Sequence, residues 1–362
     1  MWRPVLVGSL VSVVALATTA TVSSAGSTSG VVAATHALTP YLKAPTKLAV
    51  TTPLKSKAPT HKTFVYIQCA FPQCQDVAVG VAAAAQAIGW TYKRLTFDET
   101  NPATLVTAMQ QALLYKPAAV SFNAIPESAW ASEIPAYKDA GVSIIPIETG
   151  PTPLKGSIIT AIGDDGAMQG SILADWVTSN SKGKAHVLVV NVPAFGLLAQ
   201  SASGFNSRIK SLCPACVVTS LNATPAEQGN NQITPAVVSA VQRDPSITYV
   251  VATDGVIFPA LPAALKAAGI TGVKIAGGDA TVENEQDVMA GTESAFVPTN
   301  FQYLGWLAID AEARHLEGMG IAPDGGGMPE QLLIKSNTKS ASESANIPAN
   351  FQGLFKKLWH VG

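Results

Sequence analysis

The segment Val250-Val-Ala-Thr-Asp-Gly-Val-Ile-Phe-Pro-Ala-Leu-Pro-Ala-Ala-Leu-Lys-Ala-Ala-Gly269 decides the fold of this 362-residue chain. It opens with an apolar run, which predicts a buried strand over residues 249–253. A helix is predicted over residues 260–268, and Gly269 ends it, because glycine readily adopts the left-handed backbone that closes a helix. A strand that leads directly into a helix is the building unit of a parallel sheet covered by helices.

The same unit recurs on both sides of this segment and forms two series. The first series has predicted strands at residues 63–68, 91–97, 118–122, 143–147 and 157–162. The second has predicted strands at residues 186–191, 217–221, 249–253 and 274–277, again separated by helical patterns. Such alternation favours parallel strands joined by right-handed crossovers. Two series therefore predict an α/β protein with two Rossmann-like lobes.

The composition agrees with buried strands and excludes a class of partner. Only 13% of the residues are charged and the net charge is −1, so no electrostatic basis for binding nucleic acid exists. The hydrophobic fraction is 48%, which suits parallel strands that are covered on both faces.

The N-terminus has the pattern of an export signal. Arg3 precedes an apolar stretch over residues 5–17, and Ser23 and Ala25 are small residues before Gly26. We therefore expect a signal peptide over residues 1–25 and a secreted or extracytoplasmic protein; an uncleaved membrane anchor is the alternative. Because the first cysteine is Cys69, lipid attachment near the N-terminus is not expected.

Residues 26–62 are rich in Pro, Thr and Lys and poor in large apolar side chains. A segment of this composition buries too little surface to offset the entropy lost on ordering. The pattern predicts a disordered spacer between the leader and the domain. The alternative is a partly ordered arm that lies on the domain.

The four cysteines form two close pairs, Cys69 with Cys74 and Cys213 with Cys216. In an oxidising compartment such spacing predicts two local disulfides. The alternative for Cys213-Pro-Ala-Cys216 is a redox-active dithiol. Zinc is less favoured, since the sequence has neither a second pair with ligand spacing nor a histidine cluster. We expect no metal and no cofactor.

Candidate binding residues follow from the strand pattern, because open α/β sheets bind ligands beyond the carboxyl ends of their strands. Each candidate also has a local alternative as a turn or helix-capping residue. Those of the first series are Phe71, Gln73, Asn123, Glu148 and Thr149, and those of the second series are Phe195, Asp254, Asp279 and Thr299.

The quoted segment, the strand Ile275-Ala-Gly-Gly-Asp279 that follows it, Gly204-Phe205 and Leu332-Leu-Ile-Lys-Ser-Asn337 resemble type I periplasmic binding proteins, the ribose/galactose-type components of ABC importers. The resemblance runs from about residue 63 to the C-terminus. It implies an N-terminal lobe of residues 63–163 plus about 299–322, and a C-terminal lobe of residues 164–298 plus about 323–362. It further implies hinge segments near residues 163–165, 297–300 and 322–328, and a monomer that delivers a small ligand to a membrane permease.

Two departures from the family pattern bear on the ligand. Sugar binders often carry Asp-Arg where this chain has Glu148-Thr149, and residues 193–199 are apolar where an arginine is common. The predicted pocket keeps Glu148, Asp254 and Asp279 but lacks bidentate guanidinium donors. We therefore expect neutral hydroxylated ligands first, cationic amines second, and no anions. If Glu148 turns outward to a surface lysine, an apolar or aromatic ligand becomes the alternative.

Other function classes find less support in the sequence. The enzyme motifs G-x-S-x-G, H-E-x-x-H, G-x-x-x-x-G-K-[ST] and G-x-G-x-x-G are all absent, so we expect a protein that is not an enzyme. A repressor of the lactose-repressor type is not expected, because a leader occupies the place of its helix-turn-helix. The alternative to transport is a receptor that presents its ligand-bound state to a membrane sensor, and the sequence does not separate the two.

Overall fold

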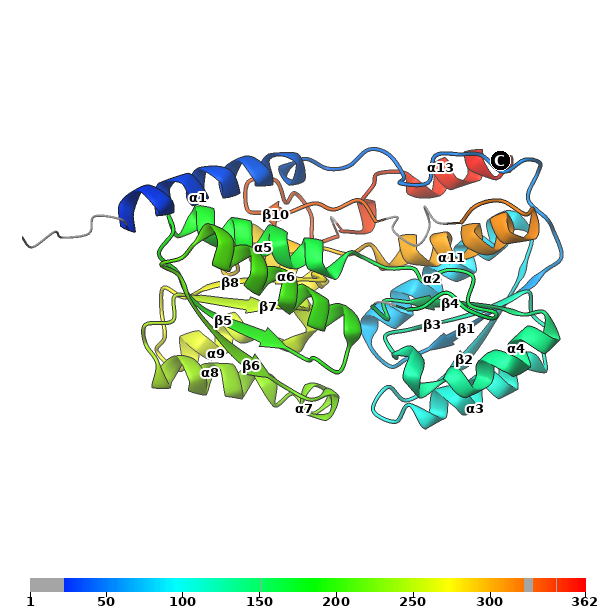
Figure 1. Ribbon diagram of the computed structural model, residues 1–362, viewed down its shortest axis with the longest axis horizontal. Coiled ribbons are helices and arrows are strands. Elements are labelled where there is room, and N and C mark those ends of the chain that lie inside the picture. Colours follow the sequence, from blue (N-terminus) through cyan, green and yellow to red (C-terminus); the bar gives the residue numbers. More distant parts are fainter. Residues whose placement is uncertain (1–22, 151, 322–327, 343) are drawn as a thin grey trace, which may run out of the picture.

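The computed structural model describes residues 23–362 except 151, 322–327 and 343, and Figure 1 shows two α/β lobes side by side. The N-terminal lobe has a four-stranded parallel sheet in the order β2-β1-β3-β4. Its strands are β1 (Thr63–Gln68), β2 (Thr91–Thr96), β3 (Ala119–Asn123) and β4 (Ser143–Ile147), and its helices are α2 (Pro72–Ile88), α3 (Ala103–Leu113) and α4 (Ile134–Ala140). Strands β3 and β4 are buried at every residue, as expected of a parallel sheet that is covered on both faces.

The C-terminal lobe has a six-stranded sheet in the order β10-β9-β8-β7-β5-β6, in which only β10 is antiparallel. Its strands are β5 (His186–Asn191), β6 (Val217–Asn222), β7 (Tyr249–Ala252), β8 (Lys274–Gly278), β9 (Ala295–Val297) and β10 (Leu333–Ile334). Its helices are α5 (Gly166–Asn180), α6 (Gly196–Leu212), α7 (Pro225–Gly229), α8 (Ile233–Arg243), α9 (Leu261–Ala267) and α10 (Val282–Ala290). The predicted fold class of two lobes with parallel sheets is confirmed.

One predicted strand of the first series is not a full strand. Residues 157–162 touch the sheet only through two isolated bridges, Ile144 with Ile158 and Ile147 with Ile162. After these bridges the chain crosses to the C-terminal lobe at residues 163–165 and enters α5. It returns between β9 and α11 (Phe301–Leu316), which packs against α2 of the N-terminal lobe.

Two glycines set the close approach of α11 and α2. A Cβ atom added to Gly80 would lie 2.1 Å from the carbonyl oxygen of Gln302, and one added to Gly305 would lie 2.5 Å from the backbone nitrogen of Val81. Any side chain at these positions forces the two helices apart. The pair of glycines thereby fixes the returning helix on the N-terminal lobe.

The C-terminal segment differs from the prediction that residues 323–362 belong to the C-terminal lobe. Strand β10 does join the sheet of that lobe, but α13 (Phe351–Leu358) lies on α11 and α2 of the N-terminal lobe (Figure 1). Trp359 stacks on Trp306 with 5.1 Å between ring centroids, and its indole nitrogen donates to Asp310. Burial of this aromatic face decides which lobe the helix joins.

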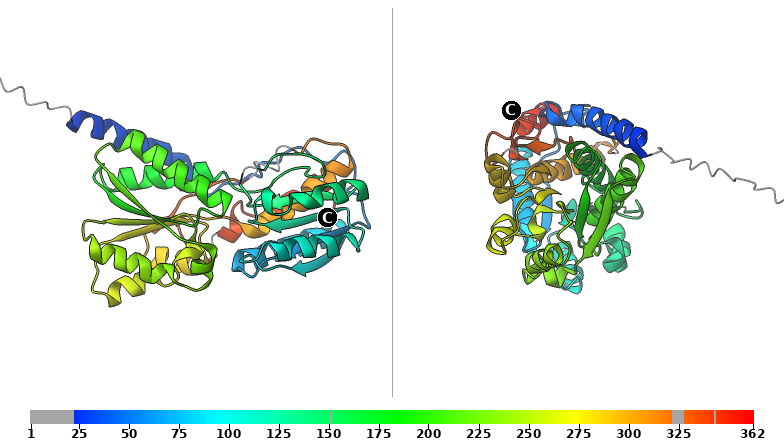
Figure 2. Two further views of the ribbon diagram at one scale, coloured as in Figure 1. Left: turned by 60° about the horizontal axis from the view of Figure 1, so that its bottom comes forward. Right: turned by 90° about the vertical axis from the view of Figure 1, so that its left-hand side faces the viewer.

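The prediction of a disordered spacer over residues 26–62 is also wrong, and the alternative of an arm on the domain agrees with the structure. Helix α1 (Ser23–Leu38) packs on α5 and α6 of the C-terminal lobe, and residues 48–58 enter the core of the N-terminal lobe (Figures 1 and 2). The predicted cleavage position before Gly26 falls within α1, and residues 1–22 of the leader lie outside the described residues.

The arm is held by a few well-placed contacts despite its polar composition. Leu48, Val50, Leu54 and Ala58 are buried among the side chains of the N-terminal lobe. The backbone nitrogen of Leu54 donates to Leu358 over 2.8 Å, and that of Ala58 donates to Trp359. Each of these apolar residues packs into the core of the N-terminal lobe, so the low average hydrophobicity of the segment does not prevent its ordering.

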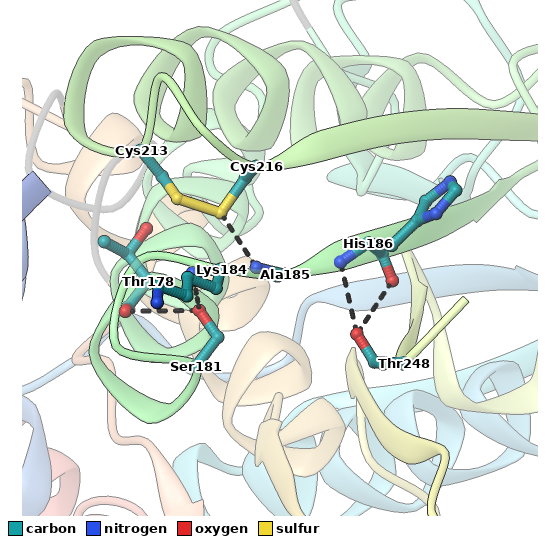
Figure 3. The surroundings of a disulfide bond; sticks show 8 residues. All are labelled: Thr178, Ser181, Lys184, Ala185, His186, Cys213, Cys216 and Thr248. Atoms are coloured by element: carbon teal, nitrogen blue, oxygen red, sulfur yellow. Dashed lines mark hydrogen bonds between the residues drawn. A yellow bond between two sulfur atoms is a disulfide. The ribbon is translucent and has the colours of Figure 1, made fainter. Parts of the chain in front are cut away.

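Both predicted disulfides are confirmed, with Cα–Cα distances of 5.5 Å for Cys69–Cys74 and 5.3 Å for Cys213–Cys216. Figure 3 shows that Cys213 and Cys216 close the turn between α6 and β6. The sulfur of Cys216 accepts a hydrogen bond from the backbone nitrogen of Ala185, beside the start of β5. This bridge therefore also ties the turn to the neighbouring strand.

We predict that the folded protein contains no free thiol. Thiol titration of protein unfolded without reductant should detect none of the four cysteines, because both pairs are bridged. After reduction the same assay should detect all four. Four reactive thiols before reduction would contradict both the pairing and an oxidising compartment.

We predict that Leu54→Ala lowers the free energy of unfolding by about 2–3 kcal/mol, because it removes buried methyl groups from the N-terminal core. Val32→Ala is the matched control, since Val32 lies on the same arm but is 64% exposed and should change stability by less than about 0.5 kcal/mol. Chemical denaturation of both variants measures the difference. Equal stability of the two variants would show that the arm is not part of the cooperative unit.

Candidate functional site

Two adjoining cavities lie between the lobes. The larger, of about 700 Å³, is here called the cleft, and the smaller, of about 60 Å³, is called the inner pocket. Phe71, Gln73 and Phe301 of the N-terminal lobe line both cavities, and so do Gln228 and Asp279 of the C-terminal lobe. The site is therefore shared by the two lobes, at the carboxyl ends of their strands.

The structure brings seven of the nine predicted site residues together around the inner pocket: Phe71, Gln73, Asn123, Glu148, Phe195, Asp254 and Asp279. Thr299 lines the adjoining cleft. Thr149 lines neither cavity; its hydroxyl forms a hydrogen bond with Thr152 over 2.8 Å. A position just after a strand does not by itself bring a side chain into the site, because the side chain of Thr149 points into the local turn. That these residues bind a ligand stays a prediction.

Two contacts join the lobes across the inner pocket. The rings of Phe71 and Phe195 meet edge to face with 6.5 Å between centroids. The amide nitrogen of Gln73 donates to Asp254 over 3.3 Å. Phe71 precedes α2 and Phe195 precedes α6, so each ring projects from the start of a helix toward the opposite lobe.

Three residues that follow strands have left-handed backbone conformations although none is glycine. Their φ angles are 71° at Ala124, 56° at Glu148 and 45° at Asp279. This region is costly for side chains other than glycine, and such strain concentrates where a side chain must point in a particular direction. At Glu148 and Asp279 the result is a carboxyl group turned into the interlobe site.

Buried carboxyl groups meet where the chain crosses between the lobes. The hydroxyl of Thr299 contacts both Asp164 and Asp279, yet it carries only one proton to donate. The amide nitrogen of Gln169 donates to Asp164 over 2.7 Å, and the carboxylate of Glu148 accepts from the backbone nitrogen of Asp164 over 3.1 Å. These contacts connect the hinge segment of residues 163–165 with both lobes.

Burial without a nearby cation raises the pKa of each carboxyl in this cluster. Desolvation and the charge of Asp279 raise the pKa of Asp164 to about 8, and desolvation raises that of Asp279 to about 6. Desolvation and neighbouring carboxyls also raise the pKa values of Glu148, Asp254 and Glu330 well above their ordinary range. With no ligand bound, the cluster therefore retains protons at neutral pH.

Several acceptor atoms of the site lack a partner. Glu148 Oε2, Gln73 Oε1 and Gln228 Oε1 form no hydrogen bond with any described residue. Glu148 is 7% exposed and forms no ion pair within the described chain, which contradicts the alternative that it turns outward to a lysine. Unsatisfied buried acceptors are costly, so they mark positions where a ligand can donate.

Sequence reasoning missed Gln228 and the role of Asp164. Gln228 lies in α7, after the end of β6, a position that the strand-end rule covers but that was not considered. Residues 163–165 were predicted to form a hinge segment, and in the structure Asp164 and Asp165 have different roles. Asp165 caps α5 by accepting from Met168 over 3.0 Å, whereas Asp164 joins the carboxyl cluster.

Neither a metal site nor a membrane span is found within the described ranges. Those residues contain no group of three or more His, Cys, Asp or Glu side chains arranged to hold a metal ion. No helix of the same part of the chain is long and apolar enough to cross a bilayer.

Comparison with known proteins agrees with the two-lobed architecture. Among solved structures, an ABC sugar transporter subunit from Rhodobacter sphaeroides is 20% identical with a TM-score of 0.66, covering 76% of this chain and 98% of its own. A solute-binding protein from Agrobacterium vitis bound with α-D-tagatopyranose is 19% identical with a TM-score of 0.69. The match covers 80% of this chain and 99% of that protein.

A carbohydrate transporter solute-binding protein from Agrobacterium radiobacter, in complex with D-arabinose, is 18% identical with a TM-score of 0.68, covering 79% of this chain and 98% of its own. At such identities the likeness establishes the fold. No curated protein sequence matches the chain. The family model described as the periplasmic binding protein domain matches residues 70–320, most of both lobes. The chain therefore belongs to the periplasmic binding protein family, in its type I form.

Proposed function

We propose that this protein captures a small, hydroxyl-rich solute between its lobes and delivers it to a membrane ABC importer. The observation that carries the proposal is the convergence of polar and aromatic side chains from both lobes on one site. The protein would act outside the cytoplasm after export by its N-terminal leader. It would bind the solute without altering it.

The chemistry of the site favours a ligand with several hydroxyl groups. Glu148, Asp254 and Asp279 accept hydrogen bonds, while the rings of Phe71 and Phe195 can cover an apolar face of a sugar or polyol. The sugar-bound relatives from the two Agrobacterium species support the same class. Anionic ligands are disfavoured, because a further negative charge beside buried carboxyls has nothing to pair with.

Closure follows from the division of the site between lobes. Gln73 and Phe71 belong to one lobe, Asp254 and Phe195 to the other, and the two pairs already touch. A ligand that contacts both sides stabilises the closed arrangement relative to the open one by its differential affinity. The hinge crossings at residues 163–165 and 298–300 provide the segments about which the lobes move.

We predict that calorimetry with a panel of sugars and polyols yields saturable binding with one site per chain. Ligand recovered after prolonged incubation should be chemically unchanged, because the site combines acceptors and aromatic faces without a nucleophile–base pair. Chromatography and mass spectrometry of the recovered ligand provide the check. A chemically altered ligand would show an enzyme instead.

We predict that Asp254→Ala and Asp279→Ala each weaken ligand binding by about 1.5–3 kcal/mol, since each removes a hydrogen-bond acceptor and leaves the ligand's donor without a partner. Asp139→Ala is the control, because Asp139 is an exposed carboxylate on α4 and lines neither cavity. Calorimetry should find its affinity unchanged, and circular dichroism should show all three variants folded. If neither site variant loses affinity, the ligand lies elsewhere.

A further inference from the structure

We propose that the captured solute carries a protonated amine beside its hydroxyl groups, as an amino sugar or amino polyol does. This inference rests on the proposed function and specifies the ligand class. It places cationic ligands before neutral ones, whereas the sequence favoured neutral ligands first. Three independent features of the site lead to it: its charge, its unpartnered acceptors and its division into two cavities.

The first feature is the charge of the lining residues. The cleft is lined by five carboxylate side chains, and Glu148 and Asp254 add two more in the inner pocket; the five are Asp76, Asp279, Glu283, Asp287 and Glu293. Of the residues that the structure describes, no Lys, Arg or His lines either cavity. The net charge of the whole chain is only −1, so the acidity is concentrated at this site.

The described residues provide no counter-charge for these carboxyl groups. None of the seven carboxylates takes part in an ion pair with a described residue; the ion pairs present lie elsewhere, as at Arg208–Asp175 and Arg314–Asp310. The hydrogen bonds that these carboxylates do receive come from amides, hydroxyls and backbone nitrogens, for example from Asn284 to Glu293 over 2.9 Å. A cationic ligand group supplies the missing counter-charge.

The second feature is a set of acceptors without donors. Glu148 Oε2 and Gln228 Oε1 have no partner among the described residues, although their side chains are only 7% and 6% exposed. Both side chains line the inner pocket. A hydroxyl group donates one hydrogen bond and brings lone pairs of its own, whereas an ammonium group donates three and brings none. The ammonium therefore matches an acceptor-rich pocket better.

The third feature is the division of the space. The inner pocket, of about 60 Å³, has mainly apolar walls, and Glu148, Asp254 and Asp279 are the carboxyl side chains among its lining residues. It adjoins a cleft of about 700 Å³. A pocket of this size suits one functional group, and the cleft suits the remainder of a small polyhydroxylated molecule. The arrangement places the amine among the three carboxyls and the hydroxyls among the polar residues of the cleft.

Binding of an amine would be linked to proton release. Without ligand the carboxyls hold protons, since burial raises the pKa values of Asp164 and Asp279 to about 8 and about 6. The groups that face one another are Glu148 from the N-terminal lobe, Asp254 and Asp279 from the C-terminal lobe, Asp164 from the hinge segment of residues 163–165, and Glu330 from the segment before β10; all are acidic. An ammonium group stabilises their charged forms, so its affinity rises with pH, by up to about tenfold per pH unit for each proton released.

The test uses the full chain and matched ligand series in calorimetry. Glucosamine, galactosamine, mannosamine and 6-amino-6-deoxyglucose are each compared with the parent sugar, and the first three also with their N-acetyl forms. At least one amine should bind about tenfold or more tightly than its neutral counterparts. Its affinity should rise between pH 5 and pH 7, and titrations in buffers of different ionisation enthalpy should show proton release.

Glu148→Gln provides the decisive variant. It keeps the shape of the side chain, and it should fold because burial already favours the uncharged form of Glu148. We expect it to weaken binding of the amine at least about tenfold more than binding of the parent sugar, so that the preference for the amine is lost. Asp139→Asn, which removes an exposed charge on α4, should keep the preference.

The outcomes separate this inference from the proposed function. A parent sugar that binds as tightly as its amine at every pH overturns the amine inference and leaves solute capture intact. The amine inference is also overturned if Glu148→Gln weakens binding of the amine and of the parent sugar equally. The carboxylate would then contribute to binding independently of the charge of the ligand. Absence of binding by every member of the series overturns both proposals.

Discussion

The structure depends on one electrostatic constraint: buried carboxyl groups meet at the hinge, and no described Lys, Arg or His forms an ion pair with them. Glu148, Asp164 and Asp279 come from one lobe, a hinge segment and the other lobe, and all three are less than one-tenth exposed. In a desolvated site each must be neutral, hydrogen-bonded or matched by a positive charge. The relative position of the lobes, the protonation of the carboxyl cluster and the affinity for a ligand therefore depend on one another.

The scaffold brings these groups together through ordinary topology. Parallel strands end at the same edge of each sheet, and the two edges face each other across the interlobe site. The glycine contact between α2 and α11 holds the returning helix on the N-terminal lobe, while α1 and residues 48–58 place one continuous arm on both lobes. Several covalent crossings thus connect the lobes, and any closure has to be accommodated by all of them.

The sequence predicted most of the strands, both disulfides and the meeting of seven candidate residues, because these follow from local pattern and parallel topology. It did not predict β9, and residues 157–162 form only isolated bridges. It failed where tertiary packing decides. The average composition of residues 26–62 concealed Leu48, Val50 and Leu54, each of which is buried on a surface built by distant segments. The lobe that α13 joins was likewise not predictable, because the stacking partner of Trp359 is Trp306, on a separate helix. Side-chain direction was a further limit, as Thr149 shows.

The carboxyl cluster also bears on how an empty binding protein avoids closing. In an open state water solvates the carboxylates, whereas closure removes that water and requires either proton uptake or a bound donor. The empty closed state is thus disfavoured at a pH where protons are scarce. A ligand that supplies hydrogen bonds and positive charge removes this cost, so the gain on closure is greatest for the loaded protein. Repulsion among the carboxyl groups would thus keep the empty protein open. In the proposed transport cycle, the membrane partner would distinguish loaded from empty protein by this difference in closure.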